Sequence, residues 1–254
     1  MGPQGGAARG TWFVSARTEK TAFYAVGRGT GGFRDWVTLL HPPYTLWHLS
    51  YVAIGAALVP HPVLWRLGAT MLAFFLAVGV GAHALDELNG RPLATGISSL
   101  VLAITAGVSI AIAVAMGLID GGLRLLPFVI VGAILVCGYN LELFGGLLHS
   151  DFWFGAAWGA FPVLVGAYAQ HWTLPPAAWV AAVAALFMSL AQRSLSTPAR
   201  TLRRKAARVS VVITWREGGQ QELGRGDLLA PLERALRASA WAIGALAVAL
   251  VLAR

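Results

Sequence analysis

The stretch TGISSLVLAITAGVSIAIAVAMGLI, residues 95–119, contains no charged side chain. A helix that crosses a bilayer needs roughly 20 consecutive, mostly apolar residues. Because the bilayer core offers no water to unpaired backbone groups, a single stretch of this kind crosses it as a helix. Residues 95–119 are therefore predicted to form a transmembrane helix.

Six further stretches resemble residues 95–119 in length and hydropathy. They are residues 43–60, 67–86, 124–146, 152–171, 176–192 and 237–253. Turn-forming pairs lie between several of them, including Gly121-Gly122 and Pro175-Pro176. The sequence therefore predicts an all-α fold, a polytopic transmembrane helix bundle of about seven spans.

The composition agrees with a membrane protein. Of the 254 residues, 57% are hydrophobic and 12% are charged, whereas soluble domains average roughly 25% charged residues. This excludes an ordinary soluble enzyme. The single cysteine, Cys137, excludes a disulfide-stabilised scaffold.

Basic residues indicate the orientation in the membrane. The net charge is +8, and only Arg66, Arg124 and Arg254 of the 19 Lys and Arg residues fall outside the segments expected in the cytoplasm. Cytoplasmic loops of membrane proteins carry such an excess of positive charge. We therefore expect an integral protein of the plasma membrane, with a cytoplasmic N-terminus, an outside C-terminus and no nucleic-acid partner.

The predicted spans divide the chain into four segments. They are a cytoplasmic N-terminal tail (1–42), a six-span bundle (43–192), a basic cytoplasmic loop (193–236) and a final transmembrane helix (237–254). In the tail, the glycines of residues 27–32 match a Gly-x-Gly-x-x-Gly spacing. The first span follows too closely for a βαβ unit, so a flexible tail is expected there.

The segment 193–236 is the largest one predicted outside the membrane after the tail. Residues 209–215 are β-branched and strand-like, and Gly218-Gly219 supplies a turn towards residues 220–223. Residues 228–236 are predicted to form a short helix, with Asp227 as its cap. The segment is either a connecting loop with a hairpin or a docking site for a protein partner.

Polar side chains gather at the predicted cytoplasmic ends of the spans. Ionisable groups are costly near a bilayer core and are therefore candidates for function. The candidate catalytic residues are Asp86, Glu87, Tyr139 and Glu142; the candidate metal ligands are His83, Asp86, Glu87, Glu142, His149 and Asp151; the candidate substrate-binding residues are His48, Arg91, Asn140 and Arg193.

Spacing supports a metal site, although simpler interpretations exist. Asp86 and Glu87 follow His83 by three and four residues, which places pairs of these groups on one helix face. Carboxylates suit Mg²⁺, and mixed His and carboxylate sets suit Fe, Mn or Zn. Alternatively, His83 is a packed histidine bonded to a backbone carbonyl, and Glu142 or Asp151 pairs with an arginine.

Two motifs resemble the UbiA superfamily of intramembrane prenyltransferases. Ala82-His83-Ala84-Leu85-Asp86 ends the second predicted span, and Arg91-Pro92-Leu93-Ala94-Thr95-Gly96 follows it. In that family an Asn-Asp-x-x-Asp-x-x-x-Asp motif and an Arg-Pro-Leu-x-Ser/Thr-Gly-like turn occupy these places. The resemblance covers about residues 40–192. Of the first motif only Asp86 aligns with an aspartate, and residues 189–196 contain no acid where a second acidic motif is expected.

The resemblance implies a helical bundle around a lipid-open cavity, with Mg²⁺ and an isoprenyl diphosphate as ligands. Three hypotheses stay open. The first is a divergent UbiA-like enzyme acting on an isoprenoid, with Asp86, Glu87 and Glu142 on the metal and an arginine facing phosphate. The second is an Fe, Mn or Zn enzyme that uses the histidines. The third is a non-catalytic lipid-binding or scaffold subunit.

Overall fold

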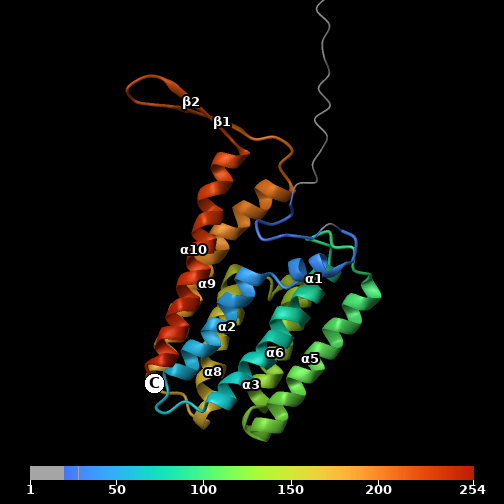
Figure 1. Cartoon of the computed structure of the whole chain (residues 1–254), viewed down its shortest axis with the longest axis vertical. Coiled ribbons are helices and arrows are strands. Elements are labelled where there is room, and N and C mark those ends of the chain that lie inside the picture. Colours follow the sequence, from blue (N-terminus) through green and yellow to red (C-terminus); the bar gives the residue numbers. More distant parts are fainter. Residues whose placement is uncertain (1–19, 28) are drawn as a thin grey trace, which may run out of the picture.

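Long helices that run side by side form most of the structure (Figure 1). The computed structural model describes residues 20–27 and 29–254. Within these residues, five helical segments are long and apolar enough to cross a membrane: Leu64–Leu88, Ser99–Arg124, Asp151–His171, Pro176–Arg204 and Arg225–Leu252. The predicted membrane bundle is confirmed at this level. Arg9, Arg17 and Arg28, which contribute to the predicted charge bias, lie outside the described residues.

The first half of the bundle contains a short entry helix and four further helical stretches. These are α1 (Phe33–Leu39), α2 (Pro42–Ala57), α3 (Leu64–Phe74) continued by the π-helix η1 (Phe75–Ala82) and α4 (His83–Leu88), α5 (Ser99–Gly121) with the 3₁₀ turn η2 (Gly122–Arg124), and α6 (Leu126–Asn140). The second half begins with another interrupted helix. Its elements are η3 (Phe144–Gly146), α7 (Asp151–Gly155), the π-helix η4 (Ala156–Ala160), α8 (Phe161–His171), α9 (Pro176–Arg204), β1 (Ser210–Thr214), β2 (Gln220–Gly224) and α10 (Arg225–Leu252).

Helix α2 packs between α8 and α10, and its crossing with α8 is unusually close. A Cβ atom added to Gly55 would lie 2.0 Å from the Val163 carbonyl oxygen, and one added to Gly166 would lie 2.1 Å from the Val52 carbonyl oxygen. Small residues allow backbones of membrane helices to approach in this way. The two glycines therefore fix how α2 lies against α8.

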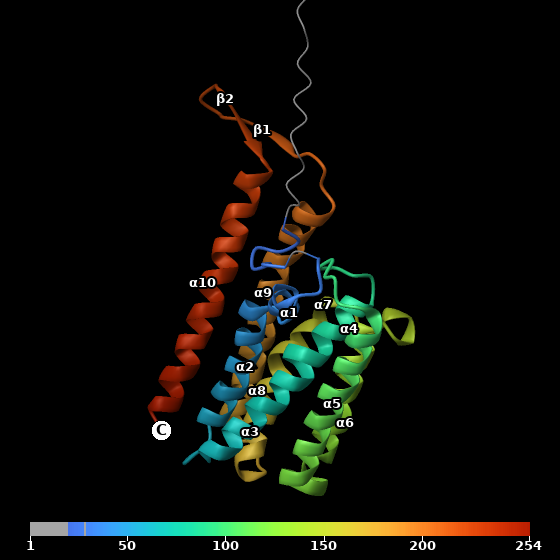
Figure 2. The ribbon, with the colours of Figure 1, turned by 45° about the vertical axis from the view of Figure 1, so that its right-hand side comes forward.

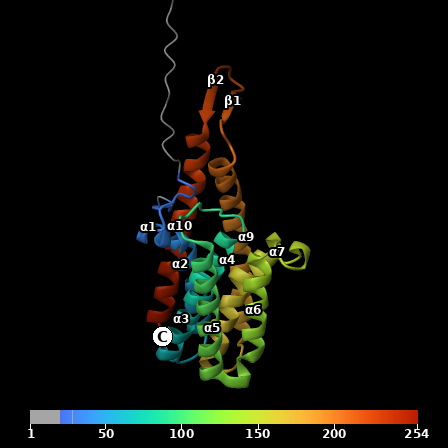
Figure 3. The same ribbon diagram turned by 90° about the vertical axis from the view of Figure 1, so that its right-hand side faces the viewer.

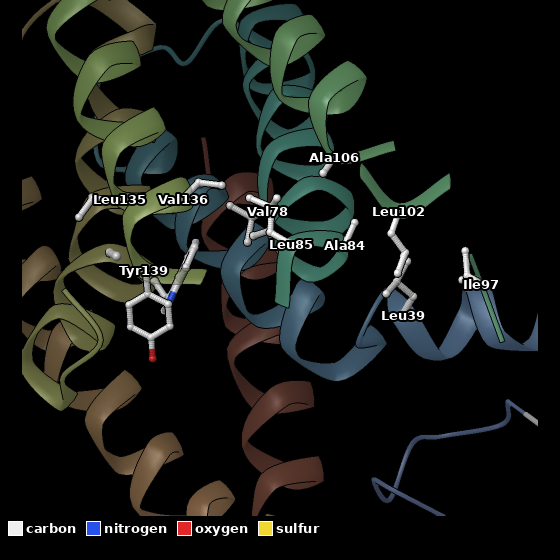
Figure 4. Packing of buried hydrophobic residues seen from close by; sticks show 13 residues of the cluster. Leu39, Val78, Ala84, Leu85, Ile97, Leu102, Ala106, Leu135, Val136 and Tyr139 are labelled. Atoms are coloured by element: carbon white, nitrogen blue, oxygen red, sulfur yellow. The ribbon is translucent and has the colours of Figure 1, made fainter. Parts of the chain in front are cut away.

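A buried cluster joins α1, η1, α4, α5 and α6 near one end of the bundle (Figure 4). Leu39, Val78 and Leu85 belong to it, together with Leu102 and Val136. Between helices of a membrane bundle, such side chains stabilise the structure chiefly through close van der Waals packing. The cluster holds the ends of α4 and α6, and the polar residues there, close to each other.

Helices α9 and α10 extend well beyond the predicted spans. Residues 193–204 continue α9 as a helix, which the sequence pattern does not predict, and the helix predicted over residues 228–236 lies within α10, which begins at Arg225. Arg203 and Glu233 form an ion pair between the two extensions. Hydropathy marks only the apolar part of a helix. Where polar side chains such as Arg203 and Glu233 find partners on a neighbouring helix, the helix can continue beyond its apolar part.

The predicted hairpin between the two extensions is confirmed. Strands β1 and β2 pair antiparallel, with Ser210 opposite Gly224 and Thr214 opposite Gln220. Asp227 accepts a hydrogen bond from the Gly224 N–H at 2.8 Å, as an acidic residue in a first helical turn does. The sequence predicts Asp227 as the cap of a helix that starts at Leu228. In the structure α10 begins at Arg225, so Asp227 lies within its first turn.

The two ends of the bundle differ in character (Figures 2 and 3). The hairpin, α1 and the connection between α4 and α5 lie towards one end, and the C-terminus and the turn between α5 and α6 lie towards the other. At the latter end Arg66 pairs with Asp120 at 3.6 Å and donates to the Gln170 carbonyl oxygen. The end with the hairpin carries the candidate site.

Candidate functional site

A polar cavity of about 180 Å³ lies where α4 and α6 end. Helices α2, α7 and α9, the π-helices η1 and η4, and the segment before α1 also contribute to its wall. Its lining is rich in imidazole, guanidinium and phenol groups, and among the described residues it includes a single carboxylate, that of Asp86. The charged and aromatic lining residues are Tyr24, His41, Tyr44, His48, His83, Asp86, Tyr139, His149, Phe154, Trp158, Arg193, Arg200 and Arg204.

A second cavity of about 120 Å³ adjoins the polar one and is almost wholly apolar. It lies between α3, η1, α5, α6, η4 and α8, among helices that are apolar enough to cross a membrane. Val78 of η1 and Trp158 of η4 line both cavities. The two π-helical segments therefore lie at the junction, and π-helical turns are frequent at functional sites.

The segment before α1 closes the polar cavity from the side of the hairpin. Thr21 donates to the Leu93 carbonyl oxygen at 3.2 Å and accepts from Arg204 Nε at 3.1 Å, while Tyr24 lines the cavity. Asp35 accepts hydrogen bonds from the N–H groups of Gly29, Gly31 and Gly96. Gly29 and Gly31 of the glycine-rich segment thus surround a carboxylate of the chain itself.

Backbone carbonyls orient three histidines at the cavity. The Nδ1 atoms of His41, His48 and His83 lie 2.7–3.0 Å from the carbonyl oxygens of Leu39, Trp158 and Gly79. Because a carbonyl only accepts, each Nδ1 carries a proton. His83 therefore has the backbone partner that one of its two interpretations predicts. The rings of His41 and His83 lie 4.0 Å apart.

Burial sets the protonation of the groups that precede α2. It lowers the pKa of His41 from 6.5 to about 3, so this imidazole is neutral at physiological pH. Burial also raises the pKa of Tyr24 well above 10, so its hydroxyl stays protonated. Tyr24 is therefore available as a neutral hydrogen-bond donor at the cavity.

Three arginines of α9 supply positive charge. Arg193, Arg200 and Arg204 are seven and four residues apart, so they share one helix face. Arg193 pairs with Asp151 and donates to the Tyr139 hydroxyl. Arg200 donates to Thr197 Oγ1 at 3.4 Å. Within the described residues, neither Arg200 nor Arg204 forms an ion pair with a carboxylate.

Glu87 lies outside the cavity, although it follows Asp86 directly. It is fully buried and accepts hydrogen bonds from the N–H groups of Leu93 and Thr95 and from the Thr95 hydroxyl, all at 2.8–2.9 Å. Successive residues of a helix point about 100° apart, so Asp86 and Glu87 face different surroundings. Glu87 organises the turn after α4, and nothing in its contacts supports the predicted catalytic or metal role.

The other candidates divide into two groups. The cavity brings together seven of them: His48, His83, Asp86, Tyr139, Asn140, His149 and Arg193. Arg91 instead donates to the Ile97 carbonyl oxygen and the Ser99 hydroxyl, which holds the turn after α4. Glu142 is 57% exposed and lies 3.9 Å from His149, and Asp151 is 78% exposed.

The predicted metal site is not assembled. Among the described residues no three His, Cys, Asp or Glu side chains are placed to hold one ion. Glu87 is occupied by the turn after α4, Glu142 and Asp151 are largely exposed, and Asp86 faces two arginines in the cavity. These residues do not fit either Mg²⁺ or Fe, Mn or Zn, which need several convergent ligands.

Sequence reasoning missed Tyr24, Arg200 and Arg204 as site residues. The spacing of Arg200 and Arg204 from Arg193 predicts a shared helix face only if the helix continues past residue 192, where the predicted span ends. Tyr24 lines the cavity in a segment that is held by hydrogen bonds of Thr21 to Leu93 and Arg204, and no local pattern encodes such long-range contacts. Comparison with family models, curated proteins and solved structures gives no match.

Proposed function

We propose that this protein is a divergent UbiA-like integral membrane protein that holds an isoprenoid or another lipid. One observation carries the proposal: an apolar cavity between apolar helices adjoins a polar cavity at the end of the bundle, and both share Val78 and Trp158. A lipid has the same two parts in the same order, an apolar chain and a polar head.

The apolar chain lies in the cavity between α3, α5 and α6. Ala77, Val136 and Phe161 are among the side chains that line it, and contact with them keeps the chain from water and from the surrounding lipid. The head lies beyond Trp158 among the polar groups. Prenyl transfer through paired acidic motifs is not part of the proposal, because Asp86 is the single carboxylate that lines the polar cavity.

The same proposal includes the topology. We place seven crossings in the membrane by adding α2 and α6 to the five long segments, with the hairpin and the N-terminal segment in the cytoplasm of a cell whose plasma membrane holds the protein. The support is the charge bias, since only Arg66, Arg124 and Arg254 of 19 basic residues fall on the other side.

Cysteine labelling in intact cells tests the topology. In a Cys137→Ala background, Pro60→Cys in the turn after α2 is expected to react with a membrane-impermeant maleimide. Glu217→Cys in the exposed hairpin turn is expected to react only after the cells are permeabilised. The opposite labelling pattern contradicts the orientation.

Filling the apolar cavity tests the lipid-binding function. Ala77→Phe places a ring in this cavity, and we expect it to weaken binding of tritiated farnesol to the purified protein in mild detergent by about tenfold, a change of about 1.4 kcal/mol. Ala103→Phe on the exposed face of α5 adds the same ring outside the cavity and should leave binding unchanged. Equal affinities for the wild type and Ala77→Phe, or no saturable binding, overturn the proposal.

A further inference from the structure

We infer that the polar cavity recognises a phosphate or diphosphate group through Arg200 and Arg204, without a divalent cation. This inference rests on the proposed function and names the chemistry of the lipid head. It departs from what the UbiA resemblance implies, since that family uses Mg²⁺ held by acidic motifs.

The charge of the cavity is positive. Of the three guanidinium groups that line it, that of Arg193 is compensated by Asp151 from the rim. Arg200 and Arg204 have no ion pair within the described part of the chain, and Asp86 is the one carboxylate in the lining. Partly buried charges are stable when they are paired, so this cavity favours an anion and disfavours a cation.

The donors are arranged for phosphate oxygens. Arg200 and Arg204 are one helical turn apart on α9, so their guanidinium groups enter the cavity from the same face. Arg204 Nε is held by the Thr21 carbonyl oxygen, and no hydrogen bond occupies its two Nη atoms within the described residues. Guanidinium forks match phosphate oxygens in geometry and charge. The protonated Tyr24 hydroxyl adds a neutral donor.

A buried amide at the same cavity lacks a partner. Gln192 is 2% exposed and lines the polar cavity, and its Oε1 atom has no hydrogen-bond partner within the described residues. Buried acceptors of this kind are nearly always satisfied in folded proteins. A hydroxyl of the ligand or a protonated phosphate oxygen supplies the missing donor.

Within the described part of the chain no cluster of acids lines this cavity, which separates it from a magnesium–diphosphate site. Mg²⁺ is held in proteins through carboxylates and the phosphates themselves. Here Glu87 is hydrogen-bonded to Thr95, residues 189–196 contain no acid, and Asp86 lies in one cavity with Arg200 and Arg204. The positive charge that attracts the phosphate comes from guanidinium groups rather than from metal ions, and a phosphate monoester carries about −1.5 to −2 charges at pH 7.

Three probes on the full-length protein in mild detergent with EDTA test the inference: farnesyl diphosphate, inorganic diphosphate and farnesol. We expect farnesyl diphosphate to bind without Mg²⁺, and Arg200→Gln and Arg204→Gln each to weaken it at least tenfold. Farnesol has no phosphate and should lose much less affinity than farnesyl diphosphate in both variants, and its retained binding shows that they are folded. Arg208→Gln, an exposed arginine beyond α9, is the matched control and should bind all probes as the wild type does.

Two outcomes overturn the inference and one overturns only the proposed function. Farnesyl diphosphate binding that requires Mg²⁺ and is lost in Asp86→Asn overturns the metal-free site, although lipid binding then stands. Unchanged binding in Arg200→Gln and Arg204→Gln also overturns it. If inorganic diphosphate binds as tightly as farnesyl diphosphate and farnesol does not bind, the phosphate site stands as a site for a soluble anion and the lipid function fails.

Discussion

Gly166→Ala is expected to lower the free energy of unfolding by about 3 kcal/mol, although alanine is the better helix former. The added Cβ atom would lie 2.1 Å from the Val52 carbonyl oxygen, so α2 and α8 have to move apart. Overpacking a close contact costs about 1–3 kcal/mol, and the backbone at this contact cannot rotate away as a side chain does. The shift also disturbs the hydrogen bond between His48 and the Trp158 carbonyl oxygen.

Gly107→Ala is the matched control. Gly107 lies within α5, and an added Cβ atom would meet no other atom within 4 Å. Alanine there is expected to be neutral or to stabilise by about 0.5–1 kcal/mol, the usual helical difference between the two residues. Unfolding of both variants, followed by tryptophan fluorescence in detergent, is the measurement. The same sign for both would contradict the close crossing of α2 and α8.

Hydropathy predicts that spans exist, but it does not predict where their helices end. Residues 95–119 lie almost wholly within α5, because an uncharged stretch of this length can only be helical in a membrane. Residues 193–204 are helical for another reason, the contacts of α9 with α10, including the Arg203–Glu233 pair. Such tertiary partners are not visible in a local window of sequence.

The sequence predicts at which end of the bundle the candidate site lies, but it does not predict the full set of side chains that form it. Polar residues at the ends of two spans pointed to this end of the bundle, and Asp86, Tyr139 and Asn140 do line the cavity there. Spacing alone groups Glu87 with Asp86. Its partners, the N–H groups of Leu93 and Thr95, follow from the path of the turn after α4, which spacing within the helix does not encode.

Glu87→Gln is expected to lower the free energy of unfolding by about 3 kcal/mol. The carboxylate accepts three hydrogen bonds at a fully buried position, and hydrogen bonds to a charged acceptor contribute about 1.5–3 kcal/mol each. Glutamine replaces one acceptor oxygen by an NH₂ donor, which then faces a backbone N–H donor of Leu93 or Thr95. A thermal unfolding midpoint in detergent, well below that of the wild type, is the expected readout.

The same variant separates a structural carboxylate from a metal ligand. Well below its lowered midpoint, Glu87→Gln should bind farnesyl diphosphate as the wild type does, with or without Mg²⁺, because Glu87 holds the turn after α4 and does not line the cavity. Glu142→Gln, at a mostly exposed carboxylate, should change neither the midpoint nor the binding. A wild-type midpoint combined with lost, Mg²⁺-dependent binding in Glu87→Gln would instead make Glu87 a ligand. The hydrogen bonds of its two oxygens would then have to be exchanged for a metal ion, and the turn from Leu93 to Thr95 would have to open when the ligand binds.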